Sequence, residues 1–243
     1  MKTSWRLRFF NNLLCRFMTS KIDVVGREEL GQLSNVPVVV ATSHLTDIDI
    51  PLVVNTLGPY LPIKVTDQTV HHHWAGEPNM LLSLLVAGKG NFLPMQVTRV
   101  GGKKYGFFKP ADFVPMVHEM RSGFSLVVAA ENPSYDGSTA TPGIGAVYLA
   151  SLAGTPILPV AVRIHALPGT AGMDNTKWKT IVRKPQATIV IGDSYRLPEI
   201  FGIAQMEEAI RSKQRGTFHA LAAGLKDRSR NLQRRLRSLT GEL

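Results

Sequence analysis

His44, Asp47 and Asp49 place an imidazole and two carboxylates within six residues. On a regular helix, a partner three residues along the chain lies almost directly above His44, whereas a partner five residues along points roughly 140° away. A helix through the whole stretch would therefore pair His44 with Asp47. Pro51 disfavours helical geometry at Ile50 and cannot lie deep inside a helix. We therefore expect the helix to begin near Asp49, with His44 on the preceding loop and free to fold back onto Asp49.

The pairing of His44 with Asp49 would be suited to proton transfer. A carboxylate bonded to one imidazole nitrogen fixes the tautomer and raises the basicity of the ring. The other ring nitrogen can then take a proton from a substrate hydroxyl. We predict His44 as a general base and Asp49 as the group that orients it; the alternative is a structural histidine beside a helix cap.

The elements that must position this pair are a strand and a helix. The apolar, β-branched run at 36–41 is typical of a strand buried on both faces. It ends in the polar residues Thr42 and Ser43, and Pro51 lies where the first turn of a helix tolerates proline. The polar cluster is therefore predicted at a strand-to-helix corner, and α/β sheets bind ligands outside the carboxyl ends of their strands.

The stretch from His44 to Asp49, HLTDID, fits an H-x4-D motif and resembles the glycerolipid acyltransferases, the family that contains 1-acylglycerol-3-phosphate acyltransferase. The resemblance extends from about residue 23 to residue 195. It implies one α/β domain with a mixed central sheet flanked by helices. It also implies transfer of an acyl group from acyl-CoA or acyl carrier protein to a hydroxyl of a lysophospholipid or related glycerolipid, with no metal and no cofactor besides the thioester co-substrate.

A second group of residues is suited to binding an anion. A predicted strand over 92–97 ends at Arg99, and two glycines precede Lys103 and Lys104. Glycines let backbone N–H groups approach an anion, and the three cations would supply charge. The stretch resembles the second block of the family, in which an arginine at a strand end helps to bind the phosphate of the acceptor. A solvated surface turn is the alternative.

Glu131 follows a fully apolar predicted strand over 124–129 and enters a polar loop. A carboxylate in such a position is seldom there for packing alone. Glu131 matches the glutamate of the family's third block, Pro-Glu-Gly-Thr-Arg-Ser, but Asn132, Pro133 and Ser134 replace the next three residues. The resemblance assigns the missing arginine to acceptor phosphate. Either the cations of the second block bind phosphate here, or the acceptor lacks glycerol phosphate.

A glycine-initiated helix is predicted over 143–150, followed by a strand over 155–162. Together they resemble the glycine helix and fourth block of the family, which lie beside the active site and the acyl channel. The resemblance makes Gly145 a substrate-binding residue, and the N–H groups around it are candidate oxyanion donors. Gly143 stands where the family often has lysine. A purely structural role for the prolines that begin the strand is the alternative.

Composition narrows the choice of partners. The chain of 243 residues has 44% apolar residues, which suits one sizeable α/β domain, and its single cysteine, Cys15, fits a reducing compartment. The formal charge of +10 calls for an anionic partner such as nucleic acid, an acidic membrane surface or a nucleotide thioester. We find no nucleic-acid-binding module, nucleophile elbow, P-loop or dinucleotide motif, so we expect no nucleic acid partner. Three adjacent histidines at 71–73 cannot share one metal with good geometry.

Both ends of the chain are basic and helical by pattern. Residues 1–22 form a predicted amphipathic, membrane-associating helix with an apolar face of Phe10, Leu13, Leu14, Phe17 and Met18. Residues 23–202 form the predicted acyltransferase domain and 203–243 a basic helical tail suited to an anionic leaflet. Docking of the first helix on the core and a solvated tail are the alternatives. No run is long enough to span a bilayer, so we expect a peripheral or monotopic protein at the cytoplasmic face of a membrane.

These features favour an O-acyltransferase with His44 and Asp49 as catalytic residues. Arg99, Lys103, Lys104, Glu131 and Gly145 are the predicted substrate-binding residues. A catalytically silent, membrane-bound lipid-binding protein of the same fold is the alternative, because the third block departs from the family.

Overall fold

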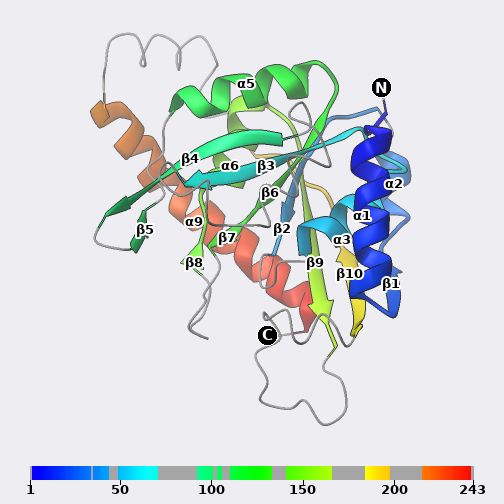
Figure 1. Cartoon of the computed structure of the whole chain (residues 1–243). Helices are drawn as coiled ribbons and strands as arrows, with labels where there is room; N and C mark the ends of the chain where they lie inside the picture. The colour runs from blue at the N-terminus through cyan, green and yellow to red at the C-terminus, as the bar shows by residue number, and fades with distance from the viewer. Residues whose placement is uncertain are drawn as a thin grey trace.

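The computed structural model describes residues 2–33, 35–43, 49–70, 92–100, 103–105, 110–132, 141–165, 184–197 and 215–241 (Figure 1). His44 and Asp47 lie outside these described residues. The same holds for the glycines at 101–102, the histidines at 71–73 and the segment at 133–137.

A mixed, eight-stranded sheet forms the centre of the molecule, with the order β1-β10-β9-β2-β6-β3-β4-β5. The run from β9 to β4 is parallel, while β10 is antiparallel to β9 and β5 is antiparallel to β4. The predicted fold class, a single α/β domain with a mixed sheet flanked by helices, is confirmed. The strands of this sheet are β1 (Lys21–Val25), β2 (Val39–Thr42), β3 (Ile63–Val70), β4 (Phe92–Val100), β5 (Lys103–Tyr105), β6 (Ser125–Ala129), β9 (Ile157–Ile164) and β10 (Gln186–Ile191).

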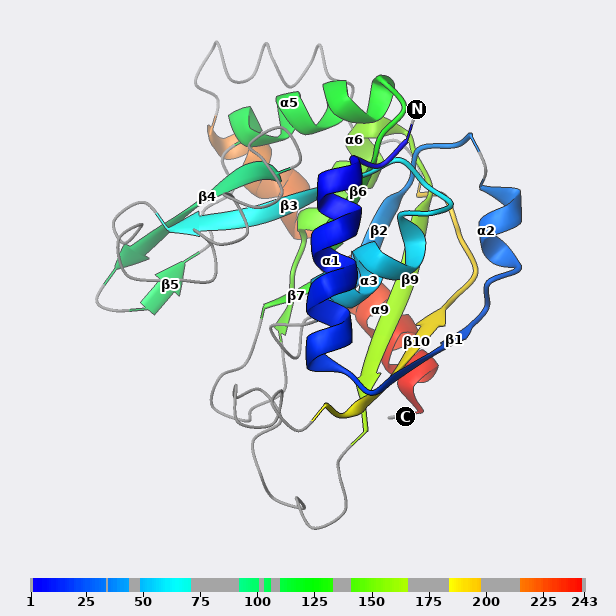
Figure 2. The ribbon, with the colours of Figure 1, turned by 45° about the vertical axis from the view of Figure 1, so that its right-hand side comes forward.

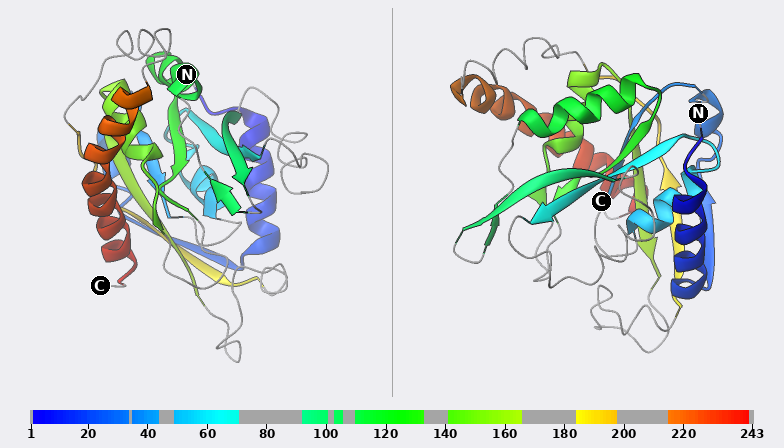
Figure 3. Two further views of the ribbon diagram at one scale, coloured as in Figure 1. Left: turned by 90° about the vertical axis from the view of Figure 1, so that its left-hand side faces the viewer. Right: turned by 45° about the horizontal axis from the view of Figure 1, so that its top comes forward.

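Helices cover both faces of the sheet. One face carries α1 and α3, and the other carries α5, α6 and α9, as the edge-on view of Figure 3 shows. The helices are α1 (Trp5–Met18), α2 (Glu29–Gln32), α3 (Asp49–Leu57), α5 (Pro110–Arg121), α6 (Gly145–Ala153) and α9 (Arg215–Thr240).

Alternate residues of the central strands supply two separate cores. Val38 and Val40 belong to the core under α1 and α3, whereas Val39 and Ala41 belong to the core under α5, α6 and α9. All four side chains are fully buried. The prediction of a strand buried on both faces is confirmed, and so is the start of the next helix at Asp49.

The β3–β4–β5 part of the sheet extends beyond its neighbours. β3 runs from Ile63 to Val70, and β4 continues past Arg99 to Val100. Figure 2 shows β3 and β4 leaving the helical layers as an arm, with β5 near its tip. Val100 pairs with Lys103, so the predicted strand continues past Arg99 and the two glycines, which lie outside the described residues, separate the strands of a hairpin.

Helix α1 packs on α3. Leu7, Cys15 and Met18 face the core, and the Cys15 thiol donates to the carbonyl oxygen of Pro51 at 3.6 Å. Thr3 fixes the start of the helix, since its hydroxyl donates to the carbonyl of Leu61 at 2.6 Å and accepts from the N–H of Ile63 at 2.8 Å. The single apolar face predicted for α1 was therefore incomplete, because the helix has one apolar face toward α3 and a second toward solvent.

The basic C-terminal helix α9 also packs on the sheet. Leu225, Leu232 and Leu236 are buried against α6 and the neighbouring strands. The Arg163 guanidinium at the end of β9 donates to the carbonyl oxygen of Thr240 at 3.3 Å. No helix in the described part of the chain combines the length and apolar character needed to span a membrane.

The packing of α1 makes a prediction about Cys15. Burial raises the pKa of its thiol to about 12, so at pH 8 the reactive thiolate is roughly a thousandfold scarcer than for a thiol of ordinary pKa. We expect the folded protein to react with Ellman's reagent at least about a hundredfold more slowly than the protein in urea. The absorbance of the released thiol reports the rate.

Leu7→Ala and Leu13→Ala provide a matched pair for this measurement. Leu7 is buried and Leu13 is 39% exposed on the same helix, so only Leu7→Ala should leave a cavity, at a cost of about 2 to 5 kcal/mol. We expect Leu7→Ala to accelerate labelling of Cys15 and Leu13→Ala to leave it nearly unchanged. Equal acceleration by both variants would contradict the packing described for α1.

Candidate active site

The carboxyl end of β2 is fixed by backbone hydrogen bonds to both neighbouring strands. The N–H of Ala130, just after β6, donates to the carbonyl oxygen of Thr42 at 2.8 Å. On the other side, the N–H of Ser43 donates to the carbonyl oxygen of Val160 at 3.3 Å, and its hydroxyl accepts from the N–H of Val162 at 3.1 Å. The residue that precedes His44 is therefore held firmly at the centre of the sheet.

Asp49 is the first residue of α3 and is fully buried. A carboxylate in the first turn of a helix is stabilised by the helix dipole, and a buried charge requires partners. The carboxylate of Asp49 has at least one bonding or electrostatic interaction in the structure, so it is not an isolated buried charge. Ser43 and Asp49 flank the segment that carries His44, which itself lies outside the described residues.

Glu131 begins a short strand that the sequence did not predict. β7 (Glu131–Asn132) pairs antiparallel with β8 (Thr141–Pro142), with Glu131 opposite Pro142. The carbonyl oxygen of Ala130 accepts from the N–H of Gly143 at 2.8 Å. The structure thus places the backbone of Glu131 one residue beyond the contact between Thr42 and Ala130, beside the end of β2.

Helix α6 begins at the same edge of the sheet, two residues after Gly143. Gly145 is its first residue, and the first hydrogen bond of the helix runs from the N–H of Tyr148 to the carbonyl oxygen of Ile144 at 2.9 Å. Burial raises the pKa of the Tyr148 phenol to about 12, and the ring packs edge-on against Phe113 with centroids 5.0 Å apart. The predicted substrate-binding glycine therefore lies at the start of a firmly packed helix.

The three predicted anion-binding cations lie on the arm. Arg99 of β4 is opposite Lys104 of β5 in the hairpin, and Lys103 is opposite Val100. Glu131 belongs to β7, which pairs with β8 in a separate two-stranded sheet, whereas the three cations belong to the β4–β5 end of the main sheet. The fold therefore brings the cations together with one another in one hairpin.

The arrangement of the connections explains why polar residues gather beside β2 and β6. The chain leaves β2 for α3, on one face of the sheet, and leaves β6 for α6, on the opposite face. Neighbouring parallel strands whose connections depart to opposite faces leave a crevice at their carboxyl ends, which is where α/β proteins bind ligands. Asp49, Glu131 and Gly145 all border this point.

Sequence reasoning grouped Thr42 and Ser43 with the polar corner but assigned them no role. The only feature of the sequence that could have indicated a structural role for them is their position directly after an apolar strand. The structure shows that both belong to the hydrogen-bonding framework that holds the corner. Among the described residues, no group of three histidine, cysteine, aspartate or glutamate side chains is placed to hold a metal ion.

The likeness of this chain to a known protein lies in its fold. No family model matches the chain, and no curated protein matches its sequence. Among solved structures, the chain is similar to the crystal structure of the 1-acyl-sn-glycerophosphate acyltransferase PlsC from Thermotoga maritima, with a TM-score of 0.50 and 15% sequence identity. The match covers 86% of this chain and 76% of the Thermotoga protein. At this identity, the likeness shows a shared fold.

The hydrogen bonds of Ser43 predict a measurable cost of removing its hydroxyl. Ser43→Ala would leave the buried N–H of Val162 without its acceptor, which costs about 1 to 3 kcal/mol. Ser122→Ala is the matched control, because the Ser122 hydroxyl donates to the carbonyl of His118 at 3.0 Å on the exposed surface. Urea unfolding should show destabilisation by Ser43→Ala and a change within about 0.5 kcal/mol for Ser122→Ala. Equal effects would contradict the anchoring role of Ser43.

Proposed function

We propose that the protein is an O-acyltransferase that moves an acyl group from acyl-CoA or acyl carrier protein to a hydroxyl of a lysophospholipid or related glycerolipid. The observation that carries the proposal is the position of Asp49. It is the buried last residue of an H-x4-D motif, at the start of α3, beside the crevice between β2 and β6. The likeness of the whole fold to a PlsC acyltransferase supports the same reaction class.

In the proposed reaction, His44 takes the proton of the acceptor hydroxyl while the carboxylate of Asp49 orients the imidazole and stabilises the imidazolium. The acceptor oxygen attacks the thioester carbonyl carbon directly, and a C–O bond forms as a tetrahedral intermediate. Collapse of that intermediate breaks the C–S bond, and the imidazolium returns its proton to the leaving thiolate. N–H groups near Gly145, at the start of α6, are the proposed donors to the oxyanion.

The acceptor is proposed to be positioned by Glu131 and, where it carries a phosphate, by the cations of the β4–β5 hairpin. Ser134 cannot supply the charge of the arginine that the resemblance places in the third block. Phosphate binding would therefore rest on Arg99, Lys103 and Lys104, which share one hairpin. An acceptor without glycerol phosphate would not need them.

We further propose that the enzyme works peripherally at the cytoplasmic face of a membrane with an anionic surface. Both basic helices carry exposed cations, but they differ in what accompanies the charge. The side of α1 away from the core exposes large apolar side chains, whereas Lys226, Arg230 and Arg234 on α9 lie among other exposed polar residues. Helix α1 is therefore the proposed attachment to lipid.

Removal of His44 tests the proposed chemistry. We expect His44→Ala to lower transfer of labelled acyl groups from acyl-CoA or acyl carrier protein to lysolipids by about 10² to 10⁴-fold, the usual contribution of a general base. Asp49→Asn should lower the same rate while leaving the affinity for the acceptor nearly unchanged. The assay follows labelled product after extraction into organic solvent.

His118→Ala is the control for loss of an imidazole, because His118 is exposed on α5. Its rate should equal that of the unmodified protein. Absence of transfer from either donor to any lysolipid, combined with binding to lipid vesicles, would refute the enzyme and favour the catalytically silent lipid-binding protein. The altered residues Asn132, Pro133 and Ser134 are the observation that supports that second candidate.

A panel of acceptors tests the role assigned to the hairpin. We expect Arg99→Gln to raise the KM for a phosphate-bearing lysolipid about tenfold, the value of one lost charge-assisted hydrogen bond. The KM for an acceptor without phosphate should not change. Arg121→Gln, at the exposed end of α5, is the matched control. Equal changes in KM for both acceptors would exclude a phosphate contact at Arg99.

A further inference from the structure

Helix α1 exposes a row of large apolar side chains on the side opposite its buried face. Trp5, Phe9, Leu13 and Phe17 recur every fourth residue and are 71%, 58%, 39% and 65% exposed. Residues at this spacing lie above one another on a helix. We call these four residues the α1 stripe. Aromatic side chains that are left in water on a basic helix are typical of a surface that meets lipid.

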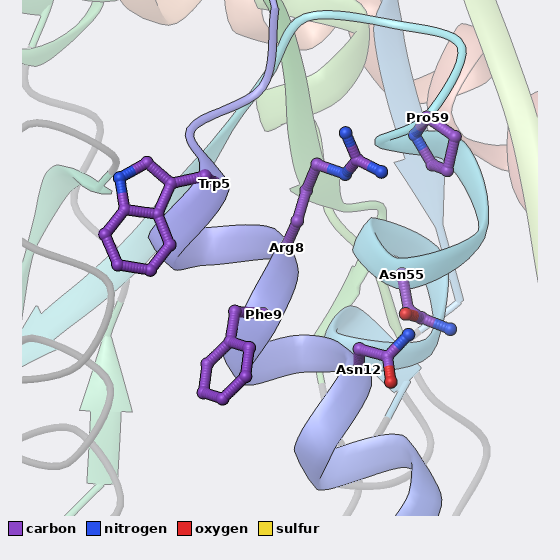
Figure 4. Close-up of a pocket in the computed structure, with 6 residues that line it drawn as sticks. All are labelled: Trp5, Arg8, Phe9, Asn12, Asn55 and Pro59. Atoms are coloured by element: carbon purple, nitrogen blue, oxygen red, sulfur yellow. The ribbon is translucent and has the colours of Figure 1, made fainter.

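A recess of about 310 Å³ lies beside the upper part of this stripe, between α1 and the end of α3 (Figure 4). Figure 4 shows Arg8 extending toward Pro59, with the amide groups of Asn12 and Asn55 close to one another below it. A guanidinium and two amides together offer several N–H donors, which suits the oxygens of a phosphate. The recess is lined by Trp5, Arg8, Phe9, Asn12, Asn55 and Pro59.

The stem of Arg8 lies against the end of α3. A Cβ atom built at Gly58 would lie 3.6 Å from Cγ of Arg8, which is an ordinary contact distance, so the two helices approach closely at this point. The guanidinium extends from there toward Pro59, on the same side of α1 as Asn12 (Figure 4).

The charge around the recess favours an anion. No acidic residue lies between Met1 and Lys21, whereas five cations do, and none of the residues that line the recess is acidic. The Arg6 guanidinium lies 5.7 Å from the centroid of the Trp5 ring, which places a second cation next to the stripe. A second copy of this chain seated on the same face would bring two basic helices together, so charge complementarity argues for an anionic lipid.

We propose that the recess binds the phosphate of an anionic phospholipid while the α1 stripe inserts into the interface of the membrane. The volume suits a headgroup, since it lies at the lower limit of ordinary ligand pockets. Asn55 is six residues after Asp49, about 9 Å along α3. The recess lies toward the end of α3 away from Asp49, and the lipid proposed to bind there is a membrane ligand distinct from the acyl acceptor.

Flotation of the full-length chain with vesicles tests the recess. Vesicles of phosphatidylcholine with one third phosphatidylglycerol are compared with vesicles of phosphatidylcholine alone. Arg8→Gln and Arg16→Gln remove the same charge from exposed positions of the same helix, and each should lose the roughly fivefold affinity that one cation contributes at an anionic leaflet. We expect Arg8→Gln to lose about tenfold more than Arg16→Gln. Equal losses would show non-specific attraction and overturn the proposal.

Asn55→Ala removes a donor of the recess without changing the charge. We expect it to weaken binding to the anionic vesicles severalfold, whereas Asn231→Ala on the exposed face of α9 should have no effect. Phe17→Ser, on the stripe but outside the recess, should weaken binding to both kinds of vesicle. Labelling of Cys15 verifies that each variant remains folded. No effect of Asn55→Ala in a folded protein would overturn the assignment of the recess.

Two further arms separate other occupants. Glycerol 1-phosphate, which carries the headgroup chemistry without acyl chains, should not displace the protein from vesicles at millimolar concentration; displacement would indicate a site for soluble phosphate. Sedimentation should show the same mass for the unmodified protein and Phe17→Ser. A dimer that Phe17→Ser dissociates, with vesicle binding unchanged, would assign the stripe to a second copy. None of these measurements requires acyl transfer. Failure of the proposed lipid site can therefore be distinguished from failure of the proposed enzymatic activity.

Discussion

The hydrogen bonds that hold the carboxyl end of β2 are the constraint on which the candidate site depends. Thr42 is bonded to Ala130 on one side, and Ser43 is bonded to Val160 and Val162 on the other. Beyond this point the chain must leave the plane of the sheet, and it does so toward α3, while β6 sends its own continuation toward α6. Neighbouring parallel strands that are continued on opposite faces in this way are where α/β proteins bind ligands. A buried carboxylate at Asp49 can therefore be held at a fixed place relative to the glycine-initiated helix.

Local features of the sequence predicted the central elements well. The β-branched run before Thr42 is typical of a central strand buried on both faces, and Pro51 favours the first turn of a helix, which predicted the start of α3 near Asp49. The β4–β5 hairpin and the β7–β8 ribbon were missed because strand pairing joins residues whose local sequence does not identify the partner. For the site, the sequence identified the candidate residues, but the pairing of Arg99 with Lys104 in one hairpin follows from strand register, which the sequence does not encode locally.

The register also bears on the altered third block. In this chain, Asn132 is paired with Thr141 in a short ribbon directly after Glu131. The ribbon ties the segment after β6 to the residues that lead into α6, since Gly143 bonds to Ala130 at its base. A positive charge missing from this segment cannot be replaced from within the ribbon, whose described residues are Glu131, Asn132, Thr141 and Pro142. If the acceptor carries a phosphate, the cations proposed to meet its charge are those of the β4–β5 hairpin.

Helix α1 has two apolar faces, one packed against α3 and one exposed to solvent. Leu7, Cys15 and Met18 hold it against α3, while the α1 stripe remains in solvent on the other side. The helix is therefore a rigid part of the domain and not a flexible anchor, because Thr3 bonds its start to the segment before β3. Helix α3 runs from Asp49 at the crevice to the recess beneath Arg8, a distance fixed by nine residues of regular helix. Insertion of the stripe into a membrane would consequently set the height and orientation of the crevice above the bilayer, so an acceptor embedded in that bilayer would approach a site of fixed geometry.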